Sequence, residues 1–129
     1  MTAARYWRLI ALEAHAGADL ELSALHLYDG TGRVDAAATL TCTIAPAAGT
    51  LAALQDEDMA STCRFAAAAV RASGFAITWD MGVGNTADVL GPRLAGPSRD
   101  TFLASCTLQY SADGQLWEWR ADFARYDFP

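Results

Sequence analysis

Residues Cys106 to Arg120 read Cys-Thr-Leu-Gln-Tyr-Ser-Ala-Asp-Gly-Gln-Leu-Trp-Glu-Trp-Arg, and this stretch predicts the fold. Side chains alternate between two faces from Cys106 to Ser111, and the same period returns from Gln115 to Arg120. Between the two runs stands Ala112-Asp113-Gly114. Asp-Gly at this place favours a tight turn, because glycine accepts the positive φ that such turns need. The stretch therefore predicts a β-hairpin.

Two of the four tryptophans lie in the second strand of this hairpin, where Trp117 and Trp119 share a face. Large aromatic side chains are more often buried in a core than used as a binding platform. We therefore expect both tryptophans to pack in the core or at its edge, with Trp119 buried if Trp117 is, and the hairpin to belong to the core of an all-β domain.

The rest of the chain predicts more short strands, separated by turns that are rich in Gly, Pro and Asp. The expected strands are Tyr6–Leu12, Leu20–Tyr28 with a break near Ser23-Ala24, Ala38–Ile44, Phe75–Met81 and an edge strand at Val89–Leu94. In the first of them, Trp7 and Leu9 are expected on one face and Tyr6, Ile10 and Leu12 on the other. A short helical turn is expected within Leu51–Ala60, and Phe65–Ala72 fits either a short helix or an irregular crossing. This pattern predicts one antiparallel β-sandwich or jelly roll over residues 1–129.

Composition narrows the classes of partner. The 129 residues carry 15 acidic and 9 basic side chains, with a formal net charge of -6. Binding to nucleic acid or to an anionic membrane surface needs clustered Lys and Arg, so neither is an expected partner.

The N-terminal residues lack the apolar region of a signal peptide, and no apolar run is long enough to span a bilayer. We expect a protein made in the cytoplasm. The cysteines form no Cys-x-x-Cys motif, and Cys106 is expected to be reduced and buried.

Motifs with a recognisable order run through most of the chain. They are Arg5–Arg8, Leu25–Gly30, Leu54–Thr62, Phe75–Gly82 and, most specific, Thr107–Gly114 followed by Trp117. This order resembles the discoidin family, also called coagulation-factor type C or galactose-binding-like domains, and especially the copies in tail proteins of bacteriophages and prophages. The resemblance implies a discoidin-like jelly-roll sandwich whose loops at one end bind a ligand, often a glycan.

The resemblance suggests a non-enzymatic structural component of a phage or phage-like particle, in its tail, baseplate or fibre region. The expected partners are other tail proteins within a homo- or hetero-oligomeric assembly, and a host-surface glycan. Tyr126 and Phe128, in the aromatic tail Phe123–Pro129, are the candidate docking residues. The alternatives are a stand-alone carbohydrate-binding module for a cell-surface polysaccharide and a lone intracellular binding domain.

Acidic residues Asp56, Glu57 and Asp58 predict a structural calcium site, because calcium requires several hard oxygen ligands. The resembled family commonly holds calcium in the corresponding loop. The alternative is an ordinary solvated loop, since three adjacent carboxylates repel one another unless a cation lies among them.

A glycan site is predicted on the loop Ala95–Ser105, with further contacts from the Gly30–Asp35 turn and the Asp56–Arg64 loop. Its candidate residues are Arg99, Asp100, Phe102 and Arg64, in which an aromatic face stacks on a sugar ring and charged groups meet hydroxyls. In the alternative interpretation Phe102 anchors the loop to the sandwich and Arg99 pairs with a nearby acid.

Catalytic motifs are missing from the sequence. It contains no Gly-x-Ser-x-Gly, no His-Glu-x-x-His and no phosphate-binding loop, and His15 and His26 stand apart from any ligand spacing. The sequence therefore argues against an enzyme.

Overall fold

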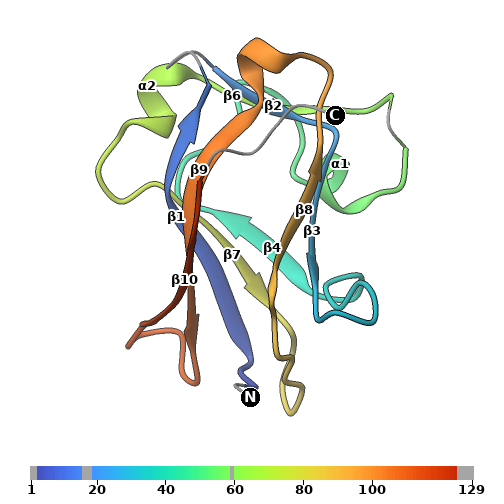
Figure 1. Cartoon of the computed structure of the whole chain (residues 1–129), viewed down its shortest axis with the longest axis vertical. Helices are drawn as coiled ribbons and strands as arrows, with labels where there is room; N and C mark the ends of the chain where they lie inside the picture. Colours follow the sequence, from blue (N-terminus) through green and yellow to red (C-terminus); the bar gives the residue numbers. More distant parts are fainter. Residues whose placement is uncertain (1–2, 16–18, 59, 125–129) are drawn as a thin grey trace.

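Antiparallel β-strands dominate the computed structural model, which describes residues 3–15, 19–58 and 60–124 (Figure 1). The strands are β1 (Tyr6–Ala14), β2 (Leu20–Leu22), β3 (Ala24–Tyr28), β4 (Thr39–Cys42), β5 (Ala48–Gly49), β6 (Cys63–Phe65), β7 (Ala76–Asp80), β8 (Gly91–Ala95), β9 (Leu103–Ser111) and β10 (Glu118–Phe123). The short helices are α1 (Ala52–Gln55), α2 (Ala67–Val70) and the 3-10 turn η1 (Arg99–Thr101).

The largest sheet has five strands in the order β10-β9-β1-β7-β4. A three-stranded sheet, β2-β6-β5, and a two-stranded sheet, β3-β8, complete the framework. Apolar side chains from all three sheets share one buried cluster, including Trp7 of β1, Leu22 of β2 and Leu25 of β3. The chain is therefore an all-β protein with a sandwich-like arrangement, which is the coarse prediction made from the sequence.

Most of the expected elements are present. The hairpin forms as β9 and β10, and the expected break between Leu20 and Tyr28 falls at Ser23, between β2 and β3. Ala38–Ile44 contains β4, Phe75–Met81 contains β7, and Leu51–Ala60 contains α1. The structure resolves the ambiguous Phe65–Ala72 stretch as the end of β6 followed by α2, and β6 itself was not expected.

The expectation that Leu12 lies opposite Trp7 and Leu9 is wrong. All three side chains are buried in the same core, because the backbone at Ala11 adopts a φ of 51°. The pairing of β1 with β9 shifts register between Ile10 and Glu13, as in a β-bulge. The bulge shifts the alternation by one residue. Trp7 and Leu9 face the core before it, and Leu12 and Ala14 face the core after it.

The expectation that Trp119 is buried is also wrong. Its side chain is 61% exposed, and Trp117 is only partly buried. Trp119 lies opposite Gln109 in the hairpin register and therefore shares a face with Gln109, whereas the neighbouring Leu108 is buried on the other face. The outer face of the five-stranded sheet thus carries an aromatic side chain that the sequence pattern assigned to the core.

Two tryptophans that face each other across β1 and β7 form the centre of the core. Trp7 and Trp79 are fully buried and directly paired. The indole N–H of Trp7 donates to the carbonyls of Ala4 (3.1 Å) and Ala87 (3.0 Å). The buried Nε1 of Trp79 has no hydrogen-bond partner among the described residues. The two indoles therefore fill similar volumes in the core, but only the N–H of Trp7 is hydrogen-bonded among the described residues.

This difference predicts unequal effects of the same substitution. Trp7→Phe is expected to lower the free energy of unfolding by about 1–2 kcal/mol more than Trp79→Phe, because only the first change removes satisfied hydrogen bonds. Both variants lose similar apolar volume, so each serves as the control for the other. Urea titration of the two variants measures the difference, and equal losses would contradict the assignment of the Trp7 hydrogen bonds.

Cys42, Cys63 and Cys106 are free thiols, and the latter two are buried. Burial, the main cause in both, raises the pKa of Cys63 and of Cys106 to about 12. Because the thiolate is the reactive form, these two side chains behave as small apolar groups.

Candidate functional site

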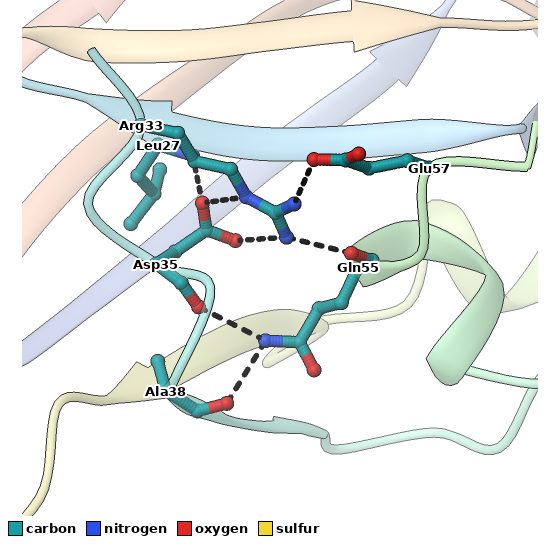
Figure 2. A network of polar contacts seen from close by, with 6 residues as sticks. All are labelled: Leu27, Arg33, Asp35, Ala38, Gln55 and Glu57. Carbon is teal, nitrogen blue, oxygen red and sulfur yellow. Dashed lines mark hydrogen bonds and ion pairs between the residues drawn. The ribbon is translucent and has the colours of Figure 1, made fainter.

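A buried carboxylate ties the β3–β4 connection to α1 (Figure 2). Oδ1 of Asp35 accepts hydrogen bonds from the backbone N–H of Leu27 (3.0 Å) and from Nε of Arg33 (2.9 Å). Nη2 of Arg33 also donates to the carbonyl of Gln55 (2.7 Å). The side-chain amide of Gln55 in turn donates to the carbonyls of Asp35 (3.3 Å) and Ala38 (2.9 Å). These polar groups satisfy one another, so the network is structural.

The predicted calcium ligands lie beside this network and have local partners. Asp56 accepts hydrogen bonds from the hydroxyl of Ser61 (2.7 Å) and the N–H of Asp58 (3.2 Å). Glu57, whose side chain is 86% exposed, lies 3.8 Å from Nη1 of Arg33. Within the described part of the chain, no group of three or more His, Cys, Asp or Glu side chains is arranged to hold a metal ion. The calcium site remains a prediction that rests on sequence alone.

Two predicted glycan residues of the Ala95–Ser105 loop, Phe102 and Asp100, differ in their accessibility. Phe102 is 1% exposed and its ring stacks with that of His15, so it offers no open face to a sugar. This corrects the stacking role expected of Phe102 and agrees with the alternative in which it anchors the loop. Arg99 and Asp100 lie in η1, and Asp100 is exposed.

Arg64 lies on β6 and is already paired. Its Nε is 2.8 Å from Oδ2 of Asp19, and its Nη1 is 3.4 Å from Oε1 of Glu21 on β2. The strand β2 also contacts η1, which brings Arg64 and η1 to the same region of the fold. The docking residues predicted at the C-terminus, Tyr126 and Phe128, lie outside the described residues.

The outer face of the five-stranded sheet is the site that the sequence did not predict. Cross-strand registers align one polar or aromatic side chain from each strand in a row. This row consists of Trp119, Gln109, Arg8, Thr78 and Thr41, from β10 to β4. Residues directly opposite in antiparallel strands share a face, so the row runs across the sheet as one surface.

Trp119 is held in place on this face although it is exposed. Its indole N–H donates to Oδ1 of Asp122 (3.1 Å), which also accepts a hydrogen bond from the hydroxyl of Thr107 (2.8 Å). Because Asp122 restrains one edge of the ring, the ring face is presented to solvent in a defined orientation.

Arg8 occupies the centre of the row. Its Nε donates to Oε1 of Gln109 (2.7 Å), and its guanidinium lies 4.1 Å from the ring centroid of Trp117, a cation–π contact. Desolvation lowers the pKa of Arg8 from its usual value. No carboxylate lies within ion-pair distance of Arg8 among the described residues, whereas Arg5 pairs with Asp80 at 2.8 Å.

A hollow of about 460 Å³ adjoins this surface. It lies between β1, the α2–β7 connection and the beginning of β7. Arg8, Glu13, Arg71 and Ser73 supply its polar lining, and Ile10 and Phe75 are among its apolar residues. The volume falls in the range of small-ligand pockets, which is about 300–1,000 Å³. Arg8 therefore belongs both to the aromatic surface and to the hollow.

Alternation in the sequence predicts that Trp117 and Trp119 share a face, but it does not show whether that face is covered. A signal for this site was present in Arg8, a charged residue that the strand pattern places on the face opposite Trp7 and Leu9. The register that brings Trp119 toward Arg8 depends on the turn and is visible only in the structure.

Comparisons with known proteins place the chain in no family: no protein-family model, curated protein or solved structure matches it. In the described residues, no helix has the length and apolar character needed to cross a bilayer.

Proposed function

We propose that this chain is a non-enzymatic component of a phage or phage-like particle, in the tail, baseplate or fibre region, that acts by docking to neighbouring proteins. The motif order of the sequence supports this proposal, and a discoidin-like jelly roll is the specific topology that we propose for the all-β framework. The observation that carries the docking role is a set of exposed apolar side chains at one end of the molecule.

Two connections supply these side chains. Val83 (84% exposed) and Leu90 (43%) lie between β7 and β8, and Leu116 (78%) lies between β9 and β10. The ends of β7 and β9 both pair with Tyr6 at the beginning of β1, so the two connections leave the sheet at the same end (Figure 1). Their apolar side chains are available to a docking protein at this end, which supports the proposal.

The test begins with the genes that neighbour the coding sequence. We expect tail genes there, and we expect their products to form a complex with this chain on co-expression. Val83→Ser combined with Leu116→Ser is expected to weaken that complex while leaving the melting temperature unchanged, because both side chains are exposed. A matched control is Thr41→Ser on the exposed sheet face. A neighbourhood without tail genes would contradict the proposal.

A second function, recognition of a host-surface glycan, is favoured by the exposed and oriented Trp119. An amphipathic aromatic face beside hydrogen-bonding groups suits a sugar ring, which has apolar C–H faces and a polar rim. This function is compatible with a place in a particle or with a stand-alone carbohydrate-binding module. A glycan array with and without calcium tests it, and chelation that abolishes a hit would assign a metal to the acidic loop.

A further inference from the structure

We propose that the outer face of the five-stranded sheet binds a saccharide that carries a carboxylate, with Trp119 packing on a sugar ring and Arg8 pairing with the carboxylate. This inference rests on the glycan-recognition function proposed above and names its site and ligand class. It moves the site away from the Ala95–Ser105 loop to the row that runs from Trp119 to Thr41.

The charge of Arg8 is the first argument. Three arginines of this acidic chain are neutralised by a carboxylate at 2.8–2.9 Å: Arg5 by Asp80, Arg33 by Asp35 and Arg64 by Asp19. Arg8 has no such partner in the described part of the chain, yet Gln109 and the ring of Trp117 hold it in one position. A fixed guanidinium without a carboxylate is complementary to an anion, and carboxylates match its planar fork in particular.

The composition of the row is the second argument, and it favours a saccharide over a protein. Protein interfaces have apolar, well-packed centres. Here the ladder positions around Arg8 are held by Gln109, Thr78 and Thr41, whose amide and hydroxyl groups can exchange hydrogen bonds with sugar hydroxyls. Trp119 supplies a single exposed aromatic face at one end of the row.

The spacing sets the size of the ligand. Trp119 and Arg8 lie on β10 and β1, with β9 between them, so the two positions are separated by two inter-strand spacings, about 10 Å. A ligand that touches both must be longer than one sugar ring. Beyond Arg8, the rest of the saccharide would enter the hollow of about 460 Å³. The lining of this hollow includes Arg71, Ser73 and the carboxylate of Glu13. The anionic group is therefore expected at Arg8, away from Glu13 and Asp122.

The experiment uses two probes of the same length, tetragalacturonate and its fully methyl-esterified form, which is neutral. Calorimetric titration of the whole chain is expected to show binding of the acid form and at least about tenfold weaker binding of the ester. Trp119→Ala and Arg8→Gln are each expected to weaken binding of tetragalacturonate by about tenfold. Arg93→Gln is the matched control, because Arg93 also lies over an aromatic ring, that of Tyr28, but on the β3-β8 sheet.

The outcomes distinguish failure of the proposed saccharide site from failure of glycan recognition as a whole. Acid-form binding that survives both substitutions, or equal affinity for the two probes, would overturn this inference and leave glycan recognition standing. Failure of the wild-type chain to bind any sugar on the array would overturn both. Light scattering checks a competing occupant: a dimer in solution that dissociates on Trp119→Ala would mean that a second copy of the chain covers this face. Thermal melting checks that each variant is folded. Trp119→Ala is expected to melt like the wild type, because the Trp119 side chain is exposed.

Discussion

Replacing Asp35 by alanine is expected to lower the free energy of unfolding by about 3 kcal/mol or more, since removal of one partner from a buried ion pair leaves an uncompensated charge. The side chain of Asp35 is fully buried and that of Arg33 is 20% exposed. The substitution removes the charge partner of Arg33 and also the acceptor for the buried N–H of Leu27. Both losses act on the connection that positions α1.

Urea unfolding at constant m value measures this loss. Glu57→Gln is the matched control, because Glu57 approaches the same guanidinium at 3.8 Å but its side chain is 86% exposed. Exposed ion pairs contribute about 0–1 kcal/mol, so this control should change stability little. Similar effects of the two substitutions would mean that the buried network of Figure 2 does not stabilise the fold.

Asp35→Asn separates charge from shape. Asparagine keeps an oxygen acceptor for Leu27 but removes the negative charge next to Arg33. If the Coulomb interaction carries most of the stabilisation, asparagine should cost nearly as much as alanine. A loss much smaller than that of alanine would instead assign most of the stabilisation to the hydrogen bond with the Leu27 N–H.

The strands of this chain were predictable where the alternation is long and bounded by turns. β7, with Ile77 and Trp79 buried, and the β9–β10 hairpin are examples. β6 was missed because three residues, Cys63 to Phe65, are too few to show a period. It forms because it pairs with β2 on one side and β5 on the other, and such long-range pairing leaves no local signal.

The face of a strand was less predictable than the strand itself, because a shift of one residue moves every side chain to the other side. Ala11 shifts β1 in this way, and alanine carries no sequence signal for a positive φ, which is uncommon outside glycine, asparagine and aspartate. In the hairpin, Asp113-Gly114 marks the turn correctly, but β10 begins only at Glu118. Trp119 consequently pairs with Gln109 and faces outward.

Two aromatic side chains show that exposure is harder to predict than the strand itself. The sequence pattern assigned Trp119 to the core, but its side chain is exposed; it left Phe102 open between a sugar platform and a loop anchor, and the buried ring agrees with the anchor. Residue types alone did not distinguish them, since both are large aromatics in or near strands. The cross-strand partner decided exposure for Trp119, and packing against the core decided it for Phe102.

Gly49→Ala is the substitution in β5 with the largest expected effect. The backbone at Gly49 has a φ of +74°, and a Cβ added there would lie 2.0 Å from the carbonyl oxygen of Thr62. A non-glycine residue in this left-handed region costs about 1–2 kcal/mol, and overpacking against backbone typically costs about 1–3 kcal/mol more. We therefore expect the free energy of unfolding to fall by about 3 kcal/mol.

The control is Gly74→Ala, where φ is +85° but nothing lies within 4 Å of the added Cβ. It carries the backbone cost without the clash, so about 1–2 kcal/mol is expected. The two-residue strand β5 has another way to relieve the clash, which is to separate from β6. Loss of hydrogen-exchange protection at the N–H of Ala47, which donates to the carbonyl of Arg64 at 2.7 Å, would reveal that separation. Separation of β5 from β6 would limit the loss of free energy of unfolding, so protection of Ala47 must be measured beside it. If Gly49→Ala and Gly74→Ala lower the free energy of unfolding equally and Ala47 stays protected, the close approach of Gly49 to Thr62 is contradicted.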